Sequence, residues 1–271
     1  MLEVLKSSRP SARPSYVQPP RVSEELVRQL LQERPITGEG RFGFYQIPGA
    51  NPYSDIARAV ECNVFHHFFG NTAAVMHEAY GAYEETSLFF LAVDRIAQRP
   101  AGAFRVIKNS PRGLKSLNDI AQHPLYISAS EVMAYHNIPS LDQCWDFGTV
   151  AVLKDYRGQH QDHQVVTMLY GAVIRAALSA GVHHAVLVMD HHGYTQLTQT
   201  MAIPLVPILD TEPFEYLGSA KSRAAYVYLP NVRPSAETHL SHLDDTTRRS
   251  LRPSVARVIY AEGIPDVVPV P

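Results

Sequence analysis

The segment from Trp145 to Asp190 restricts the fold of this chain more than any other part of its sequence. It holds two apolar runs, Val150–Leu153 and Ala185–Asp190, of the kind found in strands that are covered on both faces. Between them, apolar residues recur at helical spacing and end before Gly181, a typical position for a helix-ending glycine. These residues are Val165, Leu169, Ala172, Val173, Ala176 and Ala180. The order strand, turn, helix, strand predicts a β-α-β unit.

The flanking segments predict further helices and a β-hairpin. Helices are expected at 23–33, 53–69, 73–80, 114–122, 128–135 and 194–201, from apolar spacing and from capping residues or flanking glycine and proline. Two β-rich runs, Ser87–Asp94 and Gly102–Asn109, are separated by a polar turn and predict the hairpin. A closing strand is expected at Ala224–Leu229, and residues 36–50 are expected to be a loop or a short strand.

Proline positions suggest how the chain divides. Prolines crowd residues 1–20, which predicts a flexible N-terminal arm. Residues 21–230 are expected to form one domain. Residues 231–271 contain further prolines and the charged run Asp244–Arg249, and are expected to be a peripheral tail.

Composition excludes several classes of protein. The net charge is −2, so no overall field favours nucleic acid. No apolar stretch approaches the roughly 18 residues that span a bilayer, and the N-terminus lacks the apolar core of a signal peptide. A cytoplasmic location is therefore expected. Cys62 and Cys144 are expected to be reduced and buried.

The phrase AVLKDYRGQ, followed by the helix at 164–180, resembles the GNAT acyltransferases. The resemblance implies an α/β (α+β) GNAT fold, with a central mixed, twisted sheet of about six to seven strands flanked by helices. It also implies an acyl thioester donor, with donor contacts at Val152, Arg157, Gly158 and His160. The family's turn is rich in glycine, because backbone N–H groups must approach a pyrophosphate closely. Here His160 and Asp162 stand at two of those glycine positions.

Three other segments resemble the N-acyl amino acid synthases and acyl-homoserine-lactone synthases of the same fold. They are Glu84–Arg105, Trp145-Asp146 and Tyr216–Leu229. This resemblance implies an N-acyltransferase that takes an acyl group from acyl carrier protein or coenzyme A and passes it to a small-molecule amine or an amino acid. The Ser-Arg pair of the lactone synthases is replaced by Gly148-Thr149, so homoserine lactone is not the expected product.

Amide formation from a thioester needs a proton acceptor and groups that hold the amine. Asp146 is the expected base, or the group that holds the acceptor ammonium, and Glu84 and Glu85 are further candidates for acceptor binding. Tyr194 is the expected proton donor to the leaving thiolate. Each of these residues also has a plainer interpretation, as a surface or ion-paired acid or as a packed tyrosine.

Arg105 and Trp145 are the expected substrate-binding residues. Arg105 lies in an otherwise apolar strand, where a lone charge needs a partner. That partner is either a carboxylate of the substrate or a structural acid, and the sequence leaves both open. No metal is expected, because no Cys or Glu ligand set accompanies His160 and His163.

Two other functions compete with acyl transfer. The altered phosphate turn suggests a non-catalytic GNAT-like protein that binds a ligand or partner. A thioesterase or other hydrolase is disfavoured, because the sequence lacks a G-x-S-x-G motif.

Overall fold

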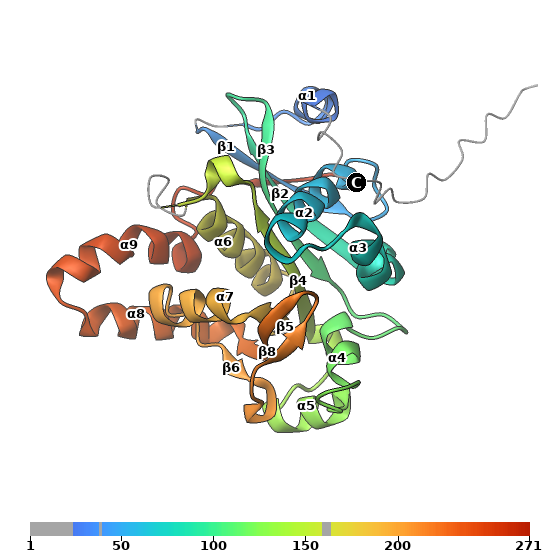
Figure 1. The fold of residues 1–271 in the computed structure, drawn as a ribbon. Helices are drawn as coiled ribbons and strands as arrows, with labels where there is room; N and C mark the ends of the chain where they lie inside the picture. The colour runs from blue at the N-terminus through green and yellow to red at the C-terminus, as the bar shows by residue number, and fades with distance from the viewer. Residues whose placement is uncertain (1–23, 38–39, 159–163) are drawn as a thin grey trace, which may run out of the picture.

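Figure 1 shows a computed structural model of the chain, which describes residues 24–37, 40–158 and 164–271. The strands are β1 (Phe42–Pro48), β2 (Ser87–Asp94), β3 (Arg99–Ile107), β4 (Cys144–Val152), β5 (His184–Asp190), β6 (Val206–Pro207), β7 (Phe214–Tyr216), β8 (Ser219–Tyr228) and β9 (Val267–Pro269). The α-helices are α1 (Glu24–Glu33), α2 (Ser54–Phe69), α3 (Ala73–Tyr80), α4 (Lys115–Ile120), α5 (Ala129–His136), α6 (Gln164–Ser179), α7 (His191–Thr195), α8 (Val232–His242) and α9 (Asp245–Tyr260).

The strands of the described residues form one mixed sheet in the order β6-β8-β5-β4-β3-β2-β1-β9, with β7 paired to β8. The β4–β5 and β1–β9 pairs are parallel, and the others are antiparallel. The predicted mixed sheet is confirmed, but the expected six to seven strands are too few. The additional strands β6, β7 and β9 have two or three residues each. That length is too short to show an alternating apolar pattern.

Alternation along β2 explains how its half of the sheet is covered. Phe89, Leu91 and Val93 belong to an apolar cluster with α1 and α2, whereas Leu88 and Phe90 belong to the cluster that contains α6. Successive residues of a strand point to opposite faces, so every residue of β2 is buried. Figure 1 shows α2 on one side of these strands and α6 on the other.

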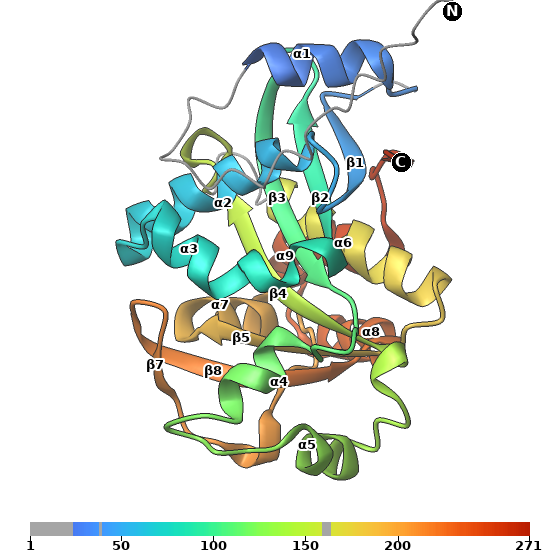
Figure 2. The same ribbon diagram turned by 90° about the vertical axis from the view of Figure 1, so that its right-hand side faces the viewer.

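The other half of the sheet, β5 and β8, is covered in the same way. Val186 and Tyr226 pack in one cluster with the α4–α5 segment, which lies beside β8 in Figure 2. Leu187 and Val227 pack on the opposite face with residues of α6 and of the turn after α7. The parallel β4–β5 step joins the two halves.

The predicted helix ends are confirmed where a cap residue marked them. α2 ends at Gly70, which has φ 70°, and Gly181 after α6 has φ 72°. α5 begins with a capping box in which Ser128 and Glu131 satisfy each other's backbone N–H groups. In the segment 36–50, where a loop or a short strand is expected, the structure has the strand β1, and its pairing with β2 is a long-range contact that local composition does not reveal. Cys62 and Cys144 are free and buried, as expected.

The C-terminal residues are part of the core, which corrects the expectation of a peripheral tail at 231–271. Helix α9 buries Val255 and Val258, and β9 adds a parallel strand beside β1. The contact between α9 and α6 is close at Gly171, where an added Cβ would lie 2.3 Å from the carbonyl oxygen of Arg257. The predicted arm at 1–20 lies outside the described residues. Within the described part of the chain, no helix is long and apolar enough to cross a membrane.

We expect Gly171→Ala to destabilise the fold by about 1–3 kcal/mol, because the new methyl group would force α9 away from α6. Alanine favours a helix over glycine by about 1 kcal/mol, so the sign of the measured change separates the two effects. Leu178→Ala, at a 39% exposed position of the same helix, serves as control and is expected to change stability by about 0.5 kcal/mol or less. Urea denaturation of both variants measures the difference. A stabilised Gly171→Ala would mean that α9 does not press on α6.

Candidate active site

Strands β4 and β5 separate because of a bulge at Gly148. Arg105 of β3 pairs with Thr149 of β4, but the next residue, Val106, pairs with Phe147, so Gly148 is left over. An extra residue of this kind bends its strand. The pairing of β4 with β5 runs from Cys144 to Asp146 and ends just before the bulge. Beyond it, the edge of β4 that faces β5 has no strand beside it among the described pairs.

A cavity of about 550 Å³ occupies the space where the two strands diverge. Its walls come from β4, β5, α2, α6, the α7 segment and the β7–β8 hairpin. Most of the lining is apolar or aromatic, including Phe65, Phe68, Phe104, Phe147, Val150, Leu187 and Met201. A largely apolar cavity with a few polar groups is the usual form of a small-molecule site.

Two polar side chains stand out in the cavity wall. Tyr170 of α6 is 4% exposed, and its ring meets that of Phe104 edge-on at 5.2 Å. Its hydroxyl has no hydrogen-bond partner among the described residues. Burial, and secondarily the charge of Asp190, raise the pKa of Tyr170, so it stays a protonated donor. Asp190 ends β5, and its Oδ1 accepts the Gly193 N–H at 3.0 Å.

Three of the four predicted donor-binding residues belong to the wall of this cavity. Val152, Arg157 and Gly158 all line it. The Arg157 Nε donates to the Val152 carbonyl, and the guanidinium lies 4.5 Å from the ring centre of Phe68. Gly158 has φ 93°, a conformation that favours glycine. His160 lies outside the described residues.

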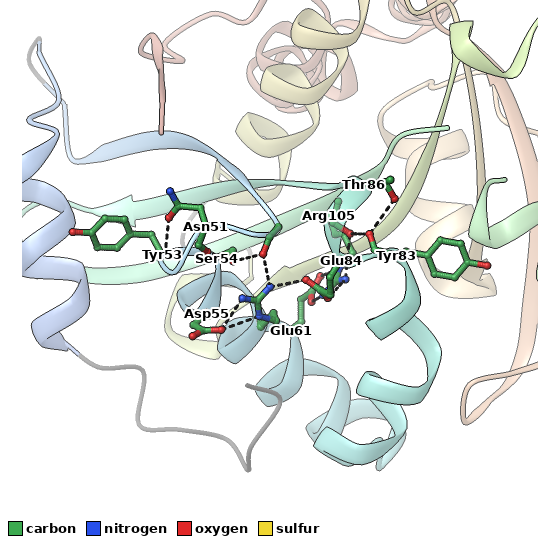
Figure 3. A network of polar contacts seen from close by, with 12 residues as sticks. Asn51, Tyr53, Ser54, Asp55, Glu61, Tyr83, Glu84, Thr86 and Arg105 are labelled. Carbon is green, nitrogen blue, oxygen red and sulfur yellow. Dashed lines mark hydrogen bonds and ion pairs between the residues drawn. The ribbon is translucent and has the colours of Figure 1, made fainter. Parts of the chain in front are cut away.

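Arg105 belongs to a buried ionic network rather than to the cavity (Figure 3). It is fully buried and forms two hydrogen bonds with Glu61 of α2, at 3.0 and 2.7 Å, and one with Glu84 at 2.6 Å. The second oxygen of Glu84 accepts a hydrogen bond from Arg58 at 2.6 Å. Glu84 and Arg105 thus neutralise each other's charge inside the fold. Of the two partners considered for Arg105, a substrate carboxylate and an acid of the protein itself, these contacts match the second. Glu85 is exposed and does not line the cavity within the described part of the chain.

One side chain connects this network to the cavity. Thr149 of β4 lines the cavity, and its hydroxyl donates to Glu61 Oε1. Arg105 also lies 4.8 Å from the ring centre of Tyr80, another lining residue, whose hydroxyl donates to the Gly148 carbonyl at 3.2 Å. The ionic network therefore contacts the cavity wall through Thr149 and the bulge through Tyr80.

The structure separates Asp146 from the cavity. Its carboxylate is fully buried and accepts hydrogen bonds from the backbone N–H and the hydroxyl of Ser116 in α4. Burial raises the pKa of Asp146 to about 6, although Ser116 opposes the shift. This placement ties α4 to β4 and leaves the carboxylate out of reach of a ligand in the cavity. The neighbouring Trp145 is buried in the main core.

Tyr194 lies in α7, near but not among the described residues that line the cavity. Its hydroxyl donates to the Leu205 carbonyl at 3.2 Å, and its ring packs against the main core. The plainer interpretation, a packed tyrosine, therefore matches its observed contacts. Within the described ranges, no three His, Cys, Asp or Glu side chains gather as metal ligands would.

The hairpin of β7 and β8 closes one side of the cavity. The Leu217 carbonyl at its tip accepts a hydrogen bond from Asn71 at 2.9 Å, and Leu217 lines the cavity. The next residue, Gly218, has φ 81°, and a Cβ there would lie 2.6 Å from the carbonyl oxygen of Phe69. Only glycine allows the hairpin to approach α2 this closely.

Sequence reasoning missed three of the residues that define this region. Glu61 and Tyr170 fall in predicted helices, and Asp190 ends a predicted strand. The signal for Glu61 is a charge next to Val60 and Cys62 on the buried side of its helix. Asp190 is a polar group at the carboxyl end of a buried strand, a common place for functional groups in α/β folds.

Comparison with known proteins supports the fold. No protein-family model and no curated protein matches the chain. Among solved structures, it is similar to FeeM, an N-acyl amino acid synthase from uncultured soil microbes. The TM-score is 0.52 at 13% identity, over 75% of this chain and 99% of that one. BjaI, a CoA-dependent acyl-homoserine lactone synthase solved with SAM and isopentyl-CoA, gives a TM-score of 0.48 at 15% identity, over 84% and 92%. The predicted GNAT fold is confirmed.

Proposed function

We propose that this chain is an N-acyltransferase, which moves an acyl group from an acyl thioester to the amine of a small molecule. The observation that carries the proposal is the cavity of about 550 Å³ at the divergence of β4 and β5. It has a largely apolar wall for an acyl group and an unpaired strand edge for the donor. The shared fold with FeeM, an N-acyl amino acid synthase, supports the same reaction class.

The reaction needs a nucleophilic amine and stabilisation of the charge that develops on the thioester oxygen. An acceptor that binds as an ammonium first releases one proton to solvent. The neutral amine then attacks the thioester carbonyl, a C–N bond forms, and the C–S bond breaks. Asp190 accepts the proton that the nitrogen loses and returns it to the leaving thiolate, so protons balance. The hydroxyl of Tyr170 and the free backbone N–H groups of β4 donate hydrogen bonds to the developing negative charge.

The donor is acyl coenzyme A or an acyl carrier protein, whose thioesters share the same pantetheine arm. Arg157 and Gly158 line the cavity just after β4, and in this proposal they contact the donor's phosphate. In the described structure, Arg157 is held against Phe68 and the Val152 carbonyl. A donor phosphate would therefore have to compete with these contacts for the guanidinium.

An assay with matched donors tests the proposal. The purified full chain is incubated with acyl coenzyme A and with the same acyl groups on carrier protein, with and without a panel of amines. We expect thiol release that depends on the amine, together with the amide product by mass spectrometry. Release without an amine would indicate a hydrolase, and tight donor binding without turnover would favour a non-catalytic binding protein. Absence of both binding and turnover would refute the proposal.

A further inference from the structure

The part of the cavity lined by Asp190 and Ser222 carries a negative charge that the described residues leave unpaired. Asp190 lines the cavity, and none of the ion pairs of the described residues includes it. One carboxylate oxygen accepts the Gly193 N–H, so the group is fixed in orientation. Its neighbour across the sheet is Ser222 of β8, which is 1% exposed and also lines the cavity.

The basic side chains in or near the cavity either have other partners among the described residues or are exposed. Of the described residues that line the cavity, the basic side chains are Arg157 and His192. Arg157 stacks on Phe68 and donates to the Val152 carbonyl, and His192 is exposed. Arg223 follows Ser222 on β8 and pairs across the sheet with Met189, but it is not among the described residues that line the cavity. Its guanidinium donates to the Thr211 carbonyl at 3.4 Å and lies over the ring of Tyr194.

We propose that this part of the cavity selects a primary amine that carries no carboxylate group, such as an alkylamine or an arylalkylamine. Its ammonium group pairs with Asp190, and the hydroxyl of Ser222 offers a neutral polar contact. An amino acid in the same position would bring its own carboxylate beside Asp190 without a fixed cation to neutralise it, and like charges at short range repel. This inference rests on the proposed function and narrows its acceptor, away from the amino acid that the resemblance implies.

Matched pairs of acceptors test the inference, because they differ only in the carboxylate. Phenethylamine is compared with phenylalanine, tyramine with tyrosine, and isoamylamine with leucine. We expect kcat/KM to be at least about tenfold higher for each amine, which corresponds to about 1.4 kcal/mol. Binding of the same compounds without donor is measured by calorimetry and should show the same order. This second measurement does not need turnover, so it tests the acceptor site even if the proposed reaction fails.

Asp190→Asn removes the charge but keeps the cap, since asparagine also accepts a hydrogen bond at a helix start. We expect it to lower kcat/KM for amines by about tenfold or more and to reduce the preference over amino acids. Asp244→Asn is the matched control, because Asp244 caps α9 in the same way at an exposed position and does not line the cavity. The inference is overturned if amino acids bind or react as well as the amines, if no acceptor binds, or if Asp190→Asn leaves binding and the preference unchanged.

Discussion

Arg105→Met is expected to destabilise the fold by about 3–5 kcal/mol, because it leaves buried carboxylates without their shared cation. Arg105 is fully buried and ion-paired with both Glu61 and Glu84 (Figure 3). Methionine fills much of the same space, so the loss reflects the charge more than a cavity. Urea denaturation gives the free energy of unfolding. Arg99→Met is the control: its pair with Asp155 joins side chains 45% and 62% exposed and should be worth about 1 kcal/mol or less.

The pH dependence of the variant separates this explanation from simple loss of packing. Burial raises the pKa of Glu84 above its ordinary value, and Arg105 opposes that shift. Without Arg105, the pKa in the folded state rises further. An acid with a folded-state pKa above its unfolded-state pKa binds more protons when folded, so its penalty shrinks as pH falls. The deficit of Arg105→Met relative to wild type should therefore shrink between pH 8 and pH 5.5. A deficit independent of pH, or below about 1 kcal/mol, would contradict the role given to the network.

The elements that sequence predicted well are those whose signals are local. The spacing of Val165, Leu169 and Ala172 defines α6, and Gly70 and Ser128 mark helix ends by their own conformation or hydrogen bonds. Strand β9 shows the opposite case. Its three residues are held by pairing with β1, more than two hundred positions earlier in the chain, which no local pattern encodes.

The site was harder to predict because one long-range register shift decides which carboxylate reaches the cavity. Asp146 and Asp190 both lie on core strands. Asp146 precedes the bulge at Gly148, where β4 still pairs with β5, so it is buried against Ser116. Asp190 lies at the end of β5, after the strands have separated, so it faces the cavity. The bulge depends on how β3 and β4 align, and sequence alone does not fix that alignment.

Tyr170→Phe is expected to lower kcat by about 100-fold or more while leaving the fold intact, since loss of one donor to a developing oxyanion costs this much in other enzymes. The ring contact with Phe104 survives the change, and the hydroxyl has no hydrogen-bond partner among the described residues, so little stability is lost.

Tyr45→Phe is the matched control for this change. Tyr45 is fully buried outside the described cavity lining, and its hydroxyl donates to the Arg34 carbonyl at 2.6 Å. Its loss should cost about 1 kcal/mol of stability and leave kcat unchanged. Tyr170→Phe is thus expected to lower kcat and keep stability, whereas Tyr45→Phe is expected to keep kcat and lower stability. Thermal denaturation and steady-state kinetics measure the two effects. If Tyr170→Phe keeps its kcat within about threefold, the hydroxyl does not stabilise the transition state. The backbone N–H groups of β4 would then carry that role alone.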